Sequence, residues 1–191
     1  MSLVKNRSWL RTTSFAALGA GLMLLAVVGA VVLGRYSSSE EQPSAEPIVA
    51  DFPAPELNYV DLADQRGSLS DFRGKVVLVN LWATWCPPCL AEMPVLAEAV
   101  RDHASQGLVV LALNQGESRR VVSRFVGGWG LALVVGLDPH EEAMRLLRTT
   151  ALPSSFLVDA QGQVRLAWFG AIDRDHLEAA LARVVDLGGV P

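Results

Sequence analysis

The chain has 191 residues, enough for one domain of ordinary size together with shorter extra segments. Its formal net charge is −4, but the first 35 residues carry four basic residues and no acidic one, which leaves 12 basic against 20 acidic residues, or −8, in the remainder. An acidic body without a basic cluster argues against nucleic acid as a partner, because phosphate binding requires concentrated Lys and Arg.

The N-terminal region contains an uninterrupted run of 19 uncharged, mostly apolar residues, Phe15–Leu33. This is close to the ~20 residues that cross a bilayer as a helix. Basic residues precede the run and stay on the cytoplasmic side of a membrane. The sequence therefore predicts a cytoplasmic N-terminus (1–14), a transmembrane signal-anchor helix inserted in the lipid bilayer (15–34), and an extracytoplasmic remainder in the periplasm or on the outer cell surface. A cleaved signal peptide is the alternative, but its apolar region is usually shorter, about 7 to 15 residues.

Residues 35–50 are rich in Ser, Glu and Pro and poor in large apolar side chains, so they are predicted to be a flexible linker. Globular composition begins at Asp51, and we expect one domain over 51–191. Hydrophobic periodicity predicts its elements in this order: a hairpin at 57–69, a strand at 75–82, a helix at 87–103, a strand at 108–113, a helix at 118–129, a strand at 132–135, a helix starting at 138–139, strands at 155–158 and 164–169, and a helix after Asp173. This order indicates an α/β fold in which a mixed central sheet carries helices on both faces and an N-terminal β-hairpin extension.

The two cysteines of the chain, Cys86 and Cys89, stand two residues apart between a predicted strand and a predicted helix. If Cys86 is the N-cap, the helix dipole and the free amides of the first turn favour its thiolate, which makes it the nucleophile. Cys89, one turn further on, is placed to resolve a mixed disulfide. The alternatives are a structural disulfide or half a zinc site.

Zinc would need two more ligands, and the three histidines have no ligand spacing. We therefore expect no metal and no cofactor apart from a redox-active disulfide between the two cysteines.

Pro87 and Pro88 separate the cysteines, and neither has an amide hydrogen. Only the amide of Cys89 remains to stabilise a Cys86 thiolate within the first turn, which should hold its pKa nearer neutral than acidic. Since strong oxidants of this kind are those whose reduced form is stabilised, the pair favours a reductase. Two alternatives stay open: the prolines merely start the helix, or the protein is an exported oxidant.

The run Val76–Cys89 (VVLVNLWATWCPPC), the Leu152–Pro153 pair before a strand, and the predicted anchor resemble the thioredoxin superfamily. Within it, they are most similar to the anchored extracytoplasmic reductases of the TlpA/ResA type. The resemblance covers about 51–187. It implies a thioredoxin-like fold and exchange with protein disulfides, commonly in cytochrome c maturation. It also implies apocytochrome c as a substrate and a thiol-reducing membrane electron donor.

Glu92 follows Cys89 by three residues and therefore shares its helix face. Its carboxylate could raise a cysteine pKa or take a proton from Cys89, and the related reductases carry a glutamate at the corresponding place. Asn80 stands where thioredoxins have a buried aspartate, which makes such a role for Glu92 more plausible. The alternative is an ordinary solvated glutamate.

The resemblance also implies that Pro153 is a cis-proline and that Leu152 presents its backbone to an extended substrate, in a loop against the cysteine motif. Trp85, together with Pro87 and Pro88, is expected at the rim of the substrate site. Trp82 is expected to pack in the core.

Two other functions compete with a reductase. A peroxiredoxin has a Pro-x-x-x-Thr-x-x-Cys pattern, but Val79 and Ala83 hold the places of the Pro and the Thr. A copper chaperone of the exported thioredoxin-like kind typically has three residues between its cysteines and a late histidine, and this chain has two residues there.

Overall fold

The protein is described by a computed structural model that covers residues 44–127 and 133–188. The predicted cytoplasmic residues 1–14 and transmembrane segment 15–34 lie outside the described residues. Among the residues that are described, no helix is long and apolar enough to span a membrane.

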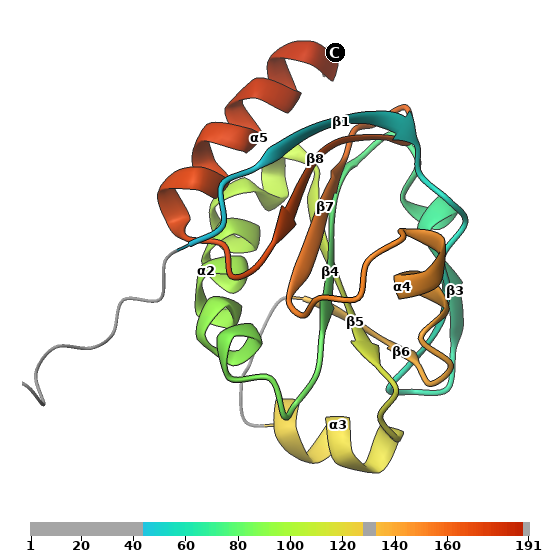
Figure 1. Ribbon diagram of the computed structural model, residues 1–191. Coiled ribbons are helices and arrows are strands. Elements are labelled where there is room, and N and C mark those ends of the chain that lie inside the picture. Colours follow the sequence, from blue (N-terminus) through green and yellow to red (C-terminus); the bar gives the residue numbers. More distant parts are fainter. Residues whose placement is uncertain (1–43, 128–132, 189–191) are drawn as a thin grey trace, which may run out of the picture. The chain divides into compact units, whose positions relative to one another are not determined.

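The fold is built on one mixed sheet with the strand order β1-β8-β7-β4-β5-β6-β2-β3 (Figure 1). The strands are β1 (Ile48–Pro53), β2 (Asn58–Asp61), β3 (Arg66–Ser68), β4 (Val76–Trp82), β5 (Leu108–Gln115), β6 (Val134–Asp138), β7 (Ser154–Val158) and β8 (Gln163–Phe169). The central strands β4, β5 and β6 run parallel, and the outer strands pair antiparallel. The predicted mixed sheet is confirmed, and the predicted hairpin is β2–β3, joined to β6.

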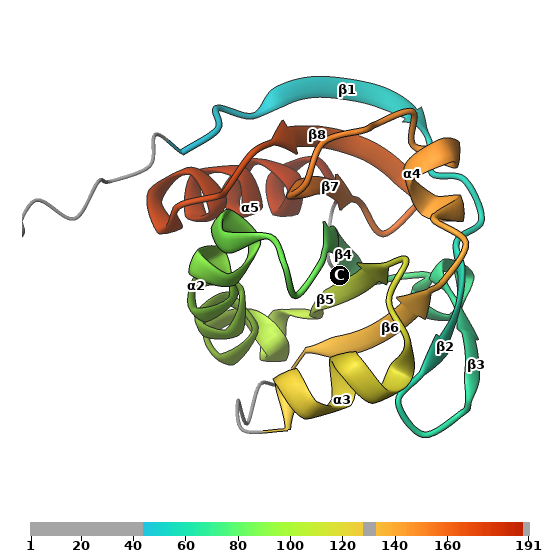
Figure 2. The ribbon, with the colours of Figure 1, turned by 60° about the horizontal axis from the view of Figure 1, so that its bottom comes forward.

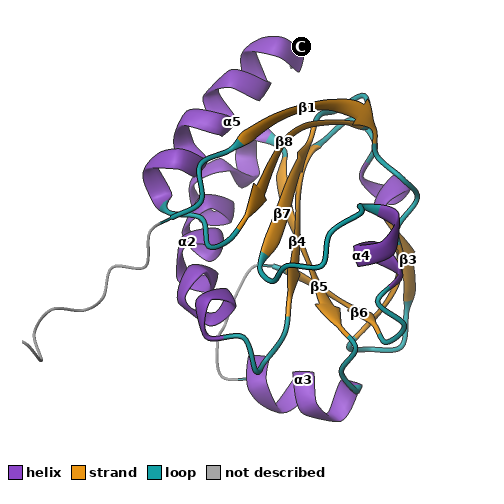
Figure 3. Cartoon of the chain, in the orientation of Figure 1, coloured by secondary structure: helices purple, strands orange, loops and turns teal. Residues whose placement is uncertain are grey.

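Helices cover both faces of this sheet, as the sequence predicts (Figures 2 and 3). The helices are α2 (Pro87–His103), α3 (Arg119–Val126), α4 (Glu142–Leu146) and α5 (Arg174–Gly188), with short 3-10 turns η1 (Leu69–Phe72) and η2 (Ala104–Gln106). α2 and α5 pack beside each other on one face, where α3 also contributes to the core, whereas α4 and η1 lie on the other.

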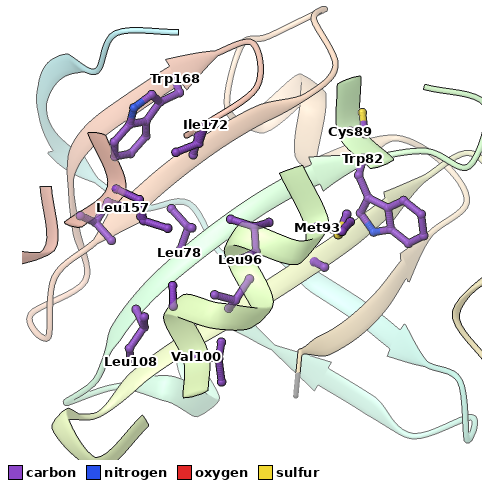
Figure 4. Close-up of a cluster of buried hydrophobic side chains, with 14 of the residues drawn as sticks. Leu78, Trp82, Cys89, Met93, Leu96, Val100, Leu108, Leu157, Trp168 and Ile172 are labelled. Carbon is purple, nitrogen blue, oxygen red and sulfur yellow. The ribbon is translucent and has the colours of Figure 1, made fainter. Parts of the chain in front are cut away.

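The central strand β4 is buried on both faces, because its apolar side chains alternate between two hydrophobic cores. Leu78 and Trp82 point to the α2 side, and Val77 and Val79 point to the α4 side. Figure 4 shows Met93 and other residues of α2 packed against this strand. A valine-rich run that is covered on both sides accounts for the strand predicted from the sequence and holds the cysteine motif on a rigid support.

The first strand begins earlier than the predicted domain boundary. β1 starts at Ile48, three residues before Asp51, and pairs with the edge of β8. Ile48 and Val49 are 56% and 78% exposed, so composition did not reveal this strand as part of a core. Its place depends on backbone pairing with a strand more than 100 residues later in the chain, and the prediction that residues 35–50 are all linker is wrong from Ile48 onward.

The helix predicted to start with Pro139 at its first position begins later, at Glu142. Asp138 instead ends β6, and its carboxylate accepts hydrogen bonds from the amides of Glu142 and Ala143, at 3.0 and 2.8 Å. The Asp138 carboxylate thus binds the first two amides of α4, but the N-cap is Glu141 and the helix begins three residues after Pro139. The helix predicted at 118–129 ends at Val126, and its predicted last residues lie outside the described residues.

Candidate active site

The cysteine motif lies where β4 turns into α2. A backbone hydrogen bond of 3.2 Å from the Cys86 amide to the Ala83 carbonyl closes the turn that follows Trp82. Cys86 then takes an extended conformation, with φ −99° and ψ 98°, and α2 starts at Pro87. Cys86 is therefore the N-cap of α2, as predicted, with its sulfur at the positive end of the helix dipole.

Cys86 and Cys89 are joined by a disulfide, with their Cα atoms 5.3 Å apart. The amide of Cys89 donates a hydrogen bond to the Cys86 sulfur at 3.3 Å, which is the donor that the two prolines leave in place. The two cysteines differ in access: Cys86 keeps 4% of its surface exposed, whereas Cys89 is completely buried. Cys86 is therefore the more accessible sulfur of the pair.

Glu92 is buried one helical turn beyond Cys89, with only 2% of its surface exposed. Its Oε1 accepts a hydrogen bond from the Asn80 side-chain amide at 2.7 Å, and its Oε2 accepts one from the Ile172 backbone amide at 2.9 Å. Burial raises the pKa of Glu92 to about 7, although both hydrogen bonds act in the opposite direction. A solvated surface glutamate is thus ruled out, and the carboxyl group can both hold and release a proton near neutral pH.

Asn80 connects Glu92 to the sheet. It is fully buried, and its side-chain amide also donates to the Ser155 hydroxyl at 2.9 Å, across the β4–β7 register that pairs these two residues. Within the described residues, the side-chain oxygen of Asn80 has no hydrogen-bond partner. The side chain at the thioredoxin aspartate position is therefore a neutral donor that supports the ionised form of Glu92.

The Leu152–Pro153 peptide bond is cis, as the resemblance implied. Leu81 and Ser154 form a register pair near the end of the β4–β7 ladder, so Pro153 reaches the sheet edge at which the cysteine motif begins. Pro153 is buried and Leu152 is half-buried.

Trp85 is exposed and Trp82 is buried, as the sequence predicts. Trp85 is 68% exposed beside Cys86, and Trp82 is 1% exposed in the core. Pro87 is exposed and Pro88 half-buried, which gives the surface around Cys86 an apolar rim.

Glu117 is a residue of this site that the sequence analysis missed. Its carboxylate accepts hydrogen bonds from the amide and the hydroxyl of Thr84, at 2.6 and 2.5 Å, and from the Asn114 side chain at 2.8 Å. Burial raises the pKa of Glu117, but these hydrogen bonds outweigh it and lower the pKa overall. Glu117 therefore anchors the turn that carries Trp85 into Cys86.

A signal for Glu117 was present in the sequence. It follows the predicted strand that becomes β5, and the carboxyl ends of the parallel strands β4 and β5 meet at the same sheet edge. A polar residue directly after β5 was therefore a candidate neighbour of the motif that follows β4.

Comparison with known proteins assigns this site to a family. The model of the AhpC/TSA family matches residues 50–167, which include the cysteine motif and Pro153. The chain belongs to the AhpC/TSA family. It is 31% identical over 163 residues to the thiol-disulfide oxidoreductase ResA of Geobacillus kaustophilus, with 85% of this chain and 91% of that protein covered. It is 33% identical over 165 residues to the ResA of Bacillus subtilis, with coverages of 84% and 83%.

Solved structures agree with this assignment. The crystal structure of a thiol:disulfide interchange protein of the thioredoxin family from Chlorobium tepidum superposes with a TM-score of 0.62 at 26% identity, covering 74% of this chain and 98% of that one. The AhpC/TSA protein described here is a thiol-disulfide oxidoreductase with a thioredoxin-like fold, and its disulfide lies at the position that the sequence predicts.

Proposed function

We propose that this thiol-disulfide oxidoreductase is a reductase of protein disulfides in which Cys86 attacks and Cys89 resolves. The observation that supports these roles is the difference in access within the pair: Cys86 reaches solvent at the start of α2, and Cys89 is buried next to the turn that holds Glu92. A nucleophile without any exposed surface could not meet a protein substrate, whereas a completely buried resolving thiol needs to meet only Cys86.

In the reduced enzyme, the Cys86 thiolate attacks one sulfur of the substrate disulfide, and the other substrate sulfur leaves as a thiolate that takes a proton. Cys89 then loses its proton to the Glu92 carboxylate and attacks the Cys86 sulfur. The second substrate sulfur leaves, and the enzyme is left with the Cys86–Cys89 disulfide seen in the structure. Two electrons pass from the dithiol to the substrate, and Glu92, with its pKa raised to about 7 by burial, can accept the proton near neutral pH.

The direction of electron transfer follows from the donors around Cys86. Pro87 and Pro88 supply no amide hydrogen, and the described contact to the sulfur is the single amide of Cys89. A thiolate with one hydrogen-bond donor is less stabilised than a thiolate with several. The disulfide is then more stable relative to the dithiol, which makes the dithiol a better reductant.

The place of the reaction is also part of the proposal. The apolar run at 15–34, preceded by basic residues, would anchor the protein in the cytoplasmic membrane with the catalytic domain outside. Since no soluble reductant pool is expected there, a membrane electron donor would reduce the disulfide again. We propose apocytochrome c as the protein substrate of this reductase. Labelling of a Cys89→Ala variant in intact cells by a membrane-impermeant maleimide supports this orientation, and labelling only after lysis contradicts it.

A trapping experiment tests the chemical roles. Cys89→Ala removes the thiol that resolves the mixed disulfide at Cys86. Mixed disulfides with substrates should therefore accumulate and be released by dithiothreitol, whereas Cys86→Ala should trap nothing. A captured set without haem-binding cysteines would contradict apocytochrome c as the substrate, and equal trapping by both variants would contradict the assigned roles. Tight copper binding without insulin reduction, or oxidation by hydrogen peroxide faster than that of a free thiol, would favour the two competing functions.

A further inference from the structure

The segment that precedes β1 is fixed to the loop between β8 and α5, as can be followed in Figure 1. The amide of Ala45 donates a hydrogen bond to the Ala171 carbonyl at 2.8 Å. The Ser44 hydroxyl donates a hydrogen bond to the Asp173 carboxylate, which also caps α5 through the His176 amide at 2.8 Å. Residues predicted to be part of a flexible linker are therefore held by two hydrogen bonds from neighbouring positions.

The Ser44–Ala45 segment lies very close to Gly170 in the loop between β8 and α5. Gly170 has φ +140°, a conformation that side chains other than glycine rarely adopt, and a Cβ atom at this position would lie 3.2 Å from the Ala45 Cβ. Ala45 is half-buried and packs against the hydrophobic core that contains Ile172 and Trp168. The loop thus has the shape needed to receive Ala45.

The hydrogen bond from Ala45 reaches the active site through one peptide group. The carbonyl of Ala171 and the amide of Ile172 belong to the same planar unit. That unit accepts from Ala45 at its oxygen and donates to Glu92 Oε2 at its nitrogen, at 2.9 Å. A peptide group that accepts at one end becomes a stronger donor at the other, because hydrogen bonds in a chain polarise one another.

We propose that the Ser44–Ala45 segment is a positioning element of the active site, which holds the Ala171–Ile172 peptide group in place and strengthens the hydrogen bond that this group donates to Glu92. The catalytic consequence rests on the proton-transfer role proposed above for Glu92. When the segment is docked, the carboxylate is favoured and can accept a proton from Cys89. When it is displaced, Glu92 keeps its proton to higher pH and resolution slows. The end of the predicted linker is thereby connected to the buried Glu92 carboxyl group.

The other groups that face Glu92 do not supply this effect. β4 and β7 present the neutral side chains of Asn80 and Ser155, and α2 presents Cys89, which is held in the disulfide. On the loop side, the titratable side chains at the start of α5 are Asp173 and His176, which bond to each other at 2.8 Å. The Ile172 amide is the described donor to Glu92 that depends on the N-terminal segment.

The first test replaces the donor atom alone. In the purified, oxidised full-length chain, Ala45→Pro removes the amide hydrogen, and Ala45→Ser is the matched control that keeps it. The titration midpoint of the Glu92 carboxyl, followed by ¹³C NMR and assigned by its loss in Glu92→Gln, should rise in Ala45→Pro by roughly 0.1 to 0.6 pH unit if only polarisation is lost. It should rise by roughly one unit or more if the Ile172 bond is also lost. Equal midpoints in the two variants overturn the proposal.

A second measurement does not depend on the folding of Ala45→Pro. In the unmodified chain, the amide resonances of Ile172 and Ala45 should both titrate with the midpoint of Glu92, and this component should vanish in Glu92→Gln, while any response to other groups persists. The amide of Ala54, which donates to the Gly162 carbonyl elsewhere, is the control that should not respond. An Ala45 amide without a Glu92-dependent component contradicts the inference.

Neither titration requires turnover, so the two proposals can fail separately. A coupled titration in a protein that does not reduce protein disulfides contradicts the proposed function alone. Normal reduction without coupling contradicts the positioning role alone.

Discussion

Replacing Glu92 with glutamine should remove the part of the pH dependence of stability that comes from its titration between pH 4.5 and 7. Burial raises the pKa of Glu92 from 4.5 to about 7, so the folded protein binds this proton more tightly than the unfolded chain does. The stabilisation is complete below pH 4.5 and is lost as the pH rises through 7. The shift of about 2.5 pH units corresponds to about 3 kcal/mol between the two limits.

The assay is urea unfolding of the disulfide-bonded protein at pH 5 and pH 8.5, followed by tryptophan fluorescence. Between these values, the contribution of Glu92 to the free energy of unfolding should fall by about 2 to 3 kcal/mol in the unmodified protein and should be absent in Glu92→Gln. Glu46→Gln, at an exposed position, controls for the loss of one carboxylate. If the unmodified protein and Glu92→Gln show the same difference between pH 5 and pH 8.5, Glu92 does not hold its proton as described.

Three further substitutions test other parts of the site and the core. Glu117→Ala removes the acceptor of three hydrogen bonds at Thr84 and Asn114, and should lower the free energy of unfolding by about 1 to 3 kcal/mol and slow turnover, with Glu117→Gln in between. Trp85→Ala should raise KM for a protein disulfide by about tenfold and leave reduction of a small aromatic disulfide unchanged, as steady-state kinetics can measure; equal effects on both substrates would place Trp85 outside the substrate contact. Phe156→Ala, at a side chain that is 2% exposed, should cost about 3 to 5 kcal/mol in urea unfolding and leave the redox potential unchanged.

The cysteine site was largely predictable because its parts are close in sequence. A valine-rich strand, a Cys-x-x-Cys and a helix signal determine that Cys86 is an N-cap and that Glu92 shares a helix face with Cys89. The effect of Pro87 and Pro88 on the sulfur also follows from covalent structure alone, since proline has no amide hydrogen.

The burial of Glu92 and its raised pKa could not be predicted from residues close in sequence. Its burial and its donor Ile172, 80 residues later, depend on how the β8–α5 loop packs against α2. The hydrogen bonds from Thr84 to Glu117, 33 residues later, were likewise not predictable, although the shared end of β4 and β5 pointed to Glu117 as a neighbour of the cysteine motif. β1 was missed because an exposed edge strand carries no core pattern. Sequence periodicity describes the faces of single elements, whereas these contacts exist only after the elements assemble.

The reduction potential of the Cys86–Cys89 pair tests the central claim most directly. It is measured by equilibration with dithiothreitol or glutathione buffers, using trapping of the thiols to separate the two forms. A reductase requires a potential at or below the glutaredoxin range of about −200 to −230 mV. A potential near the value of about −120 mV found for the strong oxidant DsbA would contradict the account and make this protein an oxidant.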